Sequence, residues 1–223
     1  MNLDDLKYAL GAVVAFSAIS AVASGVIVGG NTGASLTYLF AIIPILFLGI
    51  GSSSPGIIVA AINLFKIRFD SEFQSRRVHH EAAHFLAGYL CGLPIKSYTV
   101  DGATTQIEFF DTAEGDQAVI GRQLTRPEID PVSVVALAGA VAEVKKFGSA
   151  TGSAQDLDSL GRLMNRTSPP MRDQAQEDQT RWAALTAHKL LGRYEKEFSA
   201  LVTAFSEKKS VAECIAALET VSD

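Results

Sequence analysis

The stretch YALGAVVAFSAISAVASGVIVGGNTGASLTYLFAIIPILFLGIGSSSPGIIVAAINLF, residues 8–65, contains no Asp, Glu, Lys, Arg or His. A soluble fold rarely leaves almost sixty consecutive residues uncharged, whereas a bilayer core about 30 Å thick requires roughly 20 apolar residues per helix. The stretch therefore predicts a membrane anchor of two spans, because a third crossing would have to be short or re-entrant. A soluble part follows it.

Glycine, serine and proline divide this stretch into its expected helices. We place the first span near residues 8–28, because the turn-rich residues 29–33 follow it, and the second at about residues 36–50. Residues 51–56 then interrupt the pattern before the apolar segment 57–65. That last segment either completes the second crossing or lies in the membrane interface, and the sequence leaves both open.

The flanking charges predict which side of the membrane carries the soluble part. The start is acidic, with Asp4 and Asp5, and the apolar run is longer than that of a secretory signal peptide, whose start is basic. Positive residues instead follow the apolar stretch: Lys66, Arg68, Arg76 and Arg77. Their excess places the soluble part, and with two spans the N-terminus, on the cytoplasmic or stromal side.

One face of the first expected span carries small residues at every fourth position, namely Ser17, Ala21, Gly25 and Gly29. Such a stripe allows another helix to approach closely. We expect the stripe to pack against the second span or against another membrane protein, although small residues are also common in spans without such a role.

The bulk composition excludes some classes of function. The net charge is −5 and the isoelectric point is near 5.4, with no run of Lys and Arg among aromatic residues, so nucleic-acid binding is not expected. Cys91 and Cys214 lack the spacing of a disulfide framework or of a thiolate zinc site. Both are expected to be buried thiols.

The soluble part is predicted to be mainly α-helical with one small β-hairpin. A helix over residues 70–90 opens with acidic residues and ends near glycines. Two β-rich runs, residues 97–100 and 104–110, then flank a tight turn at Asp101 and Gly102. The hairpin therefore follows the first helix of the soluble part directly.

Helices are expected in the rest of the chain. Asp130 is the expected N-cap of an apolar helix that begins with Pro131, runs to Phe147 and stops at Gly148. A short helix is expected near residues 154–165, and two or three helices follow a pair of prolines. The apolar stripes of these last helices are formed by Trp182, Leu185, Leu190, Leu191, Phe198, Leu201, Val202 and Phe205.

A short histidine motif carries the candidate chemistry. His80, Glu81 and His84 form an H-E-x-x-H string on an expected helix, so the two imidazoles lie one turn apart on one face. Two such imidazoles can bind one zinc ion, and Glu81 can act as a general base on a water there. His79 lacks a partner four residues on and His188 stands alone, so neither is expected to be a ligand. A catalytic zinc needs a third ligand from further along the chain.

Four strings follow one another in the chain: HEAAH at 80–84, LAGAVAE at 137–143, FG at 147–148 and TGSAQDL at 151–157. Their order resembles the peptidase domain of the FtsH family, which reads H-E-A-G-H, then an L-x-G-x-x-A-E helix ending in F-G, then T-G-A-x-N-D-L. The resemblance implies that His80, His84 and Asp156 are zinc ligands. It implies that Glu81 is the general base.

The resemblance is greatest to the small FtsH-like membrane proteins of chloroplasts and cyanobacteria, which lack the ATPase domain. Like them, the chain reads HEAAHFL at 80–86, NRT at 165–167 and TRWA at 180–183. It also contains no G-x-x-x-x-G-K-[ST] phosphate loop, so ATP is not an expected ligand.

Some positions depart from the family pattern or leave alternatives open. Ala83 stands where the family has glycine, and Gln155 where it has asparagine. Asp158 is an alternative third ligand, but on a helix it points about 200° away from Asp156, so only one of them can face the metal. Glu143 is expected either to orient a ligand histidine or to be a solvated charge.

These features predict a transmembrane anchor over residues 1–66 and an FtsH-like zinc metallopeptidase domain over residues 67–223. The expected activity is ATP-independent cleavage of flexible or unfolded proteins at or near a membrane, with a thylakoid or cyanobacterial membrane as the expected location. The alternative is a catalytically silent scaffold or assembly subunit of a membrane complex. A site-2-type intramembrane protease is disfavoured, because Arg76 and Arg77 indicate an aqueous position for the motif.

Overall fold

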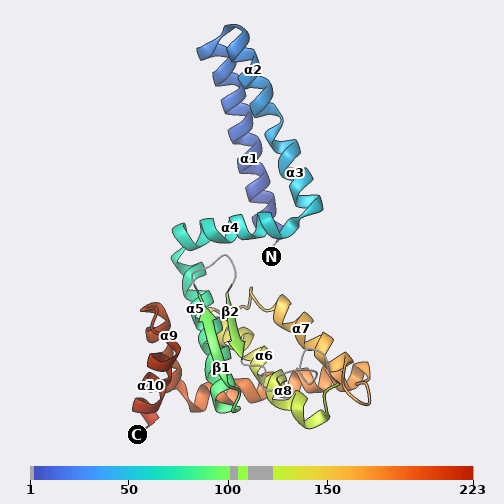
Figure 1. The fold of residues 1–223 in the computed structure, drawn as a ribbon, viewed down its shortest axis with the longest axis vertical. Helices are drawn as coiled ribbons and strands as arrows, with labels where there is room; N and C mark the ends of the chain where they lie inside the picture. The colour runs from blue at the N-terminus through green and yellow to red at the C-terminus, as the bar shows by residue number, and fades with distance from the viewer. Residues whose placement is uncertain (1–2, 101–104, 110–122, 223) are drawn as a thin grey trace. The chain divides into compact units, whose positions relative to one another are not determined.

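The computed structural model describes residues 3–100, 105–109 and 123–222 (Figure 1). Over these residues the chain is mainly helical, with one two-stranded antiparallel sheet, as the sequence predicts. It divides into two compact units, Met1–Phe69 and Asp70–Asp223. The division falls three residues after the predicted domain boundary at residue 66.

The N-terminal unit contains a helical hairpin and one further helix. Its elements are α1 (Leu3–Ala23), the π-helix η1 (Ser24–Val28), α2 (Gly30–Ala41), α3 (Ile43–Ser53) and α4 (Pro55–Phe69). Two segments of the hairpin, Leu6–Val28 and Gly30–Ser53, are long and apolar enough to cross a membrane. In an apolar stretch of 18 residues within each segment, only 11% and 6% of the residues are buried, so the apolar side chains are exposed, unlike those of a core helix in a soluble protein.

The bend of the hairpin is tighter than predicted. Gly29 and Gly30 have φ values of 63° and 58°, which glycine adopts readily, and α2 begins at Gly30. The predicted break over residues 29–33 is therefore wrong for its last residues. Gly33 lies within α2 and permits close packing instead, because a Cβ there would lie only 2.8 Å from the Ser24 carbonyl oxygen.

The stripe of small residues, which runs from α1 into η1, faces the returning helix. Ser17 Oγ donates a hydrogen bond to the Phe40 carbonyl oxygen, and Thr37 Oγ1 donates to the Ala21 carbonyl oxygen at 3.0 Å. A Cβ on Gly25 would contact Thr37 Oγ1 at 3.4 Å. Packing of the stripe against the second candidate span is confirmed for these residues, whereas contact with another membrane protein stays a prediction.

The C-terminal unit places α5 at the centre of its core. Its elements are α5 (Ser71–Leu90), β1 (Ile95–Thr99), β2 (Gln106–Phe109), α6 (Arg126–Phe147), α7 (Ala154–Asn165), α8 (Asp173–Arg193), α9 (Glu195–Ser206) and α10 (Val211–Ser222). Helix α5 packs against α6 and α9, and α6 packs against α8 (Figure 1). Every residue of α5 from His80 to Gly88 is buried, so the histidine motif lies in the interior.

The hairpin predicted after α5 is present. Strand β1 pairs antiparallel with β2, and Ile95 lies opposite Phe109. β1 begins two residues earlier than predicted, and the turn predicted at residues 101–102 lies outside the described residues. The Phe109 ring packs over Gly88, where a Cβ would overlap it. The hairpin therefore lies close against α5.

Helix α6 begins before its predicted start. Thr125, not Asp130, is the N-cap, because the Thr125 and Glu128 side chains each bind the backbone nitrogen of the other residue in a capping box. Pro131 consequently lies inside the helix, near its beginning, where it removes one intrahelical hydrogen bond. The predicted end is confirmed, since Gly148 is left-handed with a φ of 77°.

The predicted apolar stripes of the last helices are partly wrong. Trp182 and Leu185 are 45% and 54% exposed. On α8 the buried residues are Ala183, Ala187 and Leu191, of which only Leu191 belongs to the predicted stripe, and the small alanines suit packing against α6. Of the two cysteines, Cys214 is buried as predicted, and Cys91 is only partly buried.

Candidate metal centre

Two histidines of α5 lie side by side in the interior. His80 and His84 are 7% and 8% exposed, and their Nε2 atoms lie 3.0 Å apart. The helix is stabilised at its start by Asp70, whose carboxylate accepts a hydrogen bond from the Phe73 backbone nitrogen at 3.0 Å. The predicted juxtaposition of the two imidazoles on one helix face is confirmed.

Asp156, in the first turn of α7, joins the two histidines. Its Oδ2 atom lies 3.0 Å from His80 Nε2 and 3.6 Å from His84 Nε2. Ligand atoms bound tetrahedrally to one zinc ion are about 3.3 Å apart, so these separations fit a single ion. His80, His84 and Asp156 can therefore hold a metal ion. The Asp156 side chain is 26% exposed, so this centre is accessible to solvent on the side of α7.

Hydrogen bonds determine which nitrogen of each ring faces the centre. His84 Nδ1 lies 2.7 Å from the Val135 carbonyl oxygen, which can only accept, so Nδ1 carries the proton. His80 Nδ1 likewise donates to Glu143 Oε1 at 2.7 Å. In the neutral form of each ring, the Nε2 lone pair then points toward the other ring and toward Asp156. Three such donor atoms repel one another unless a positive charge lies among them.

A proton on His80 can supply this positive charge. Burial disfavours the imidazolium, but hydrogen bonds to Asp156 and Glu143 and the nearby Glu81 charge outweigh burial and raise the pKa of His80 to about 10. Burial also disfavours the Asp156 carboxylate, but a hydrogen bond from His80 and the nearby His84 ring lower its pKa. The surroundings of the two rings therefore favour a cation at this point.

Glu143 on α6 connects His80 to the loop that leads to α7. It is 2% exposed, and its carboxylate accepts hydrogen bonds from His80 Nδ1, from the Thr151 backbone nitrogen at 2.8 Å and from the Gly152 nitrogen at 3.3 Å. Although burial disfavours the carboxylate, the bonds from His80 and Thr151 lower its pKa. Of the two predicted roles for Glu143, contact with a histidine of the motif is confirmed. Its bonds also place the segment that ends at Asp156.

Arg76 supports this arrangement through contacts with Glu143 and its neighbours. No pattern in the sequence indicates this role. Its Nη1 atom lies 3.8 Å from Glu143 Oε2 and donates to the Ser149 carbonyl oxygen at 2.9 Å. The guanidinium carbon also lies 4.4 Å from the centroid of the Phe147 ring. These contacts join α5 to the end of α6, and no local spacing signals them, because the partners are far apart in sequence.

The remaining candidates lie apart from the three donor atoms or stay untested. Glu81 is 3% exposed and follows His80 on α5, and its role as general base stays a prediction. His79 binds the backbone one turn earlier through Nδ1, and His188 is exposed. Asp158 forms an ion pair with Arg162 on the exposed side of α7, so the structure favours Asp156 over Asp158 as the third donor.

Gly139 on α6 permits the close approach of the His80 ring, since a Cβ there would lie 2.6 Å from its Cε1 and Nε2 atoms. We expect Gly139→Ala to weaken metal binding by about 10- to 100-fold, because the ring must move away from Glu143. Competition with a chromophoric chelator measures this loss. Gly161→Ala is the control, because its Cβ would meet nothing within 4 Å. Equal metal affinity of the two variants would contradict the importance of this contact.

No protein-family model matches the chain, and a search of curated proteins also finds no match. The resemblance to the FtsH family therefore rests on the order of the motifs alone. Any functional conclusion has to come from these motifs and from the geometry around His80, His84 and Asp156.

Proposed function

We propose that this protein is a membrane-anchored, ATP-independent zinc metallopeptidase of the FtsH type. The observation that carries the proposal is the convergence of His80, His84 and Asp156 on one point, with Glu81 in the same helical turn as the first histidine. Two imidazoles and one carboxylate leave a fourth position for water, which is the arrangement of a catalytic rather than a structural zinc site.

The nature of the donor atoms favours zinc over magnesium or calcium. Those hard cations prefer six or more oxygen ligands, whereas zinc readily takes two imidazole nitrogens and a carboxylate oxygen. The Nδ1 atoms of the two rings bind Glu143 and the Val135 carbonyl oxygen. Metal-binding histidines are commonly oriented by such a hydrogen bond from the nitrogen that does not bind the metal, so these bonds also favour zinc.

The residues of this chain have separate tasks in the proposed hydrolysis. A zinc ion, when bound, supplies a Lewis acid that polarises a peptide carbonyl and lowers the pKa of water. Glu81 accepts a proton from the attacking water and returns it to the leaving amine nitrogen. Glu143 and Val135 hold the two Nδ1 protons and thereby keep both Nε2 atoms directed at the centre. Burial of both rings restricts their motion, so the donor atoms are preorganised.

The short connection to the anchor supports substrates at or near a membrane. Asp70 caps α5 immediately after the N-terminal unit ends, and His80 lies ten residues further along the same helix. At 1.5 Å per residue, His80 is about 15 Å from the start of α5. The chain carries no phosphate loop, so the proposed substrates are protein segments that are already flexible or unfolded. The proposed location is a thylakoid or cyanobacterial membrane, with the centre on its cytoplasmic or stromal side.

Metal analysis and chelation test this function on the full chain purified in detergent. We expect about one zinc per chain, and slow cleavage of a permanently unfolded, fluorescently labelled protein. Removal of the metal with a chelator should stop cleavage, and added zinc should restore it. Absence of bound zinc at micromolar supply would overturn the proposal. Zinc retained without turnover of any unfolded substrate would instead favour the scaffold alternative.

A further inference from the structure

Helix α4 changes the direction of the chain where the second candidate span ends. Ser54 leaves the helical conformation with φ −144° and ψ 65°, and Pro55, which has no amide hydrogen, begins the next helix. Within the N-terminal unit, α1, α2 and α3 run together, and α4 lies across the end of this hairpin that is opposite the Gly29 bend (Figure 1). Ile58, 6% exposed, holds α4 there by packing against Gly51.

The second candidate span does not need α4 to complete a crossing. Gly30–Ser53 contains 24 residues. At 1.5 Å per residue such a helix is about 36 Å long, which exceeds a hydrocarbon core of about 30 Å. Residues from Pro55 onward therefore begin at the membrane surface if this segment spans the bilayer.

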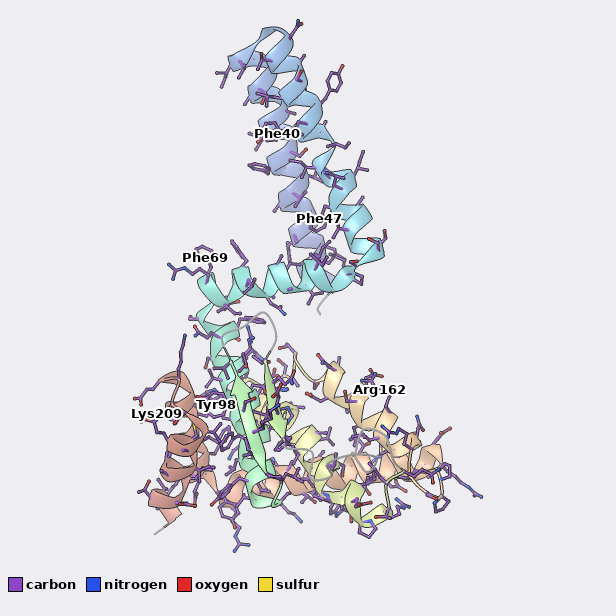
Figure 2. All side chains as sticks on the ribbon, viewed as in Figure 1. Phe40, Phe47, Phe69, Tyr98, Arg162 and Lys209 are labelled. Atoms are coloured by element: carbon purple, nitrogen blue, oxygen red, sulfur yellow. The ribbon has the colours of Figure 1, made fainter. Side chains whose placement is uncertain are left out.

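The side chains of α4 suit the boundary between water and lipid. One side exposes large apolar residues: Ile57 is 63% exposed, Leu64 52% and Phe65 66%. Phe69, 72% exposed, lies at the end of α4 away from the hairpin (Figure 2), and its ring contacts that of Phe65 at 4.6 Å between centroids.

The charges of α4 are confined to its last turn. They are the two cations Lys66 and Arg68, with no acidic residue in the helix. Lys66 projects about 180° from Ile57 around the helix axis, whereas Arg68 projects only about 20° from Ile57 and reaches the headgroups by extending its long side chain past the end of the helix. Cations beside exposed apolar side chains suit an anionic membrane surface, because they attract its headgroups.

We propose that α4 lies in the plane of the bilayer, at the boundary between the headgroups and the acyl chains. Ile57, Leu64 and Phe65 enter the acyl region, and Lys66 and Arg68 bind anionic headgroups. This inference rests on the proposed anchoring by the two candidate spans. It also deepens the proposed function, because α5 starts where α4 ends, so the metal centre stays within about 20 Å of the headgroups at any angle between the two units.

Tryptophan depth measurements on the full chain test this position. Trp182, the single tryptophan, is replaced by Phe, and Ile57→Trp and Leu64→Trp are introduced separately. The two positions face the same side of α4 and are about 10 Å apart along its axis. In vesicles of equal parts phosphatidylcholine and phosphatidylglycerol, with bromines at defined acyl carbons, we expect both residues to be quenched most by the shallow bromines, at equal depth. A depth difference of about 10 Å, as for a crossing helix, or no quenching at either position, overturns the inference.

One further variant and the natural protein separate failure of this inference from failure of the anchoring. Ile19→Trp, at a 70% exposed position of α1, should be quenched most by the deepest bromines, and the natural Trp182 should not be quenched. If Ile19→Trp is quenched and the α4 positions are not, only the inference about α4 is overturned. If Ile19→Trp is not quenched, the anchoring is overturned as well. Metal content of each variant checks that its C-terminal unit is folded.

Discussion

Glu81→Gln is expected to retain the metal and to lose cleavage by about 10³-fold. The amide has nearly the volume of the carboxylate, so it fits the buried position, which is 3% exposed, without disturbing His80 or His84. It cannot accept a proton from water at neutral pH, and the attacking water therefore stays weakly nucleophilic. The measurement is the rate of cleavage of a labelled unfolded protein, together with metal analysis of the same sample.

The control for Glu81→Gln is Glu177→Gln on α8, an exposed carboxylate that pairs with Arg181. It removes the same charge from the chain and should leave both metal and cleavage unchanged. Undiminished cleavage by Glu81→Gln would show that this carboxylate is not the base. Loss of metal from Glu81→Gln would show instead that Glu81 holds the site together, and the loss of cleavage would then say nothing about proton transfer.

Asp156→Ala is expected to weaken zinc binding by more than about 100-fold, beyond the loss typical of residues that only support a ligand. The substitution removes the one carboxylate oxygen that lies 3.0 Å from His80 Nε2 and 3.6 Å from His84 Nε2. Two imidazoles alone hold the ion less firmly and in a less defined geometry. A competition titration measures the affinity, and cleavage should fall with it.

Asp158→Ala is the matched control for Asp156→Ala, because it removes an aspartate from the same helix, two residues on. Asp158 is 65% exposed and pairs with Arg162, so its removal should leave zinc affinity unchanged. Equal losses in both variants would point to an effect on α7 as a whole. Loss only in Asp158→Ala would mean that α7 turns its other side to the metal when the ion binds.

Features that depend on neighbouring residues are those that the sequence predicts well. The bounds of α7 and the end of α6 at Gly148 agree with the prediction, because glycine and proline act within one turn of their own position. The pair His80 and His84 is equally local, since a spacing of four residues places both rings on one face of any helix. The uncharged stretch likewise marks two apolar helices without reference to the rest of the chain.

Predictions fail where two local signals compete and packing decides between them. Asp130 before Pro131 is a good helix start, but the capping box of Thr125 and Glu128 lies one turn earlier and prevails. Trp182 follows the helical period of a core residue, yet α8 presents its alanines to α6, and the larger side chain stays exposed. The exposure of Trp182, unlike the capping box, is not encoded within a few residues.

The sequence by itself determined the helical motif, the apolar hairpin and, through resemblance, which aspartate to consider. Only the tertiary structure decided that Asp156 lies beside the two imidazoles and that Glu143 binds His80. These groups come from α5, α6 and α7, which have no common period in the sequence. These groups come together only if α6 approaches α5 closely. Gly139 permits that approach because it places no Cβ against the His80 ring.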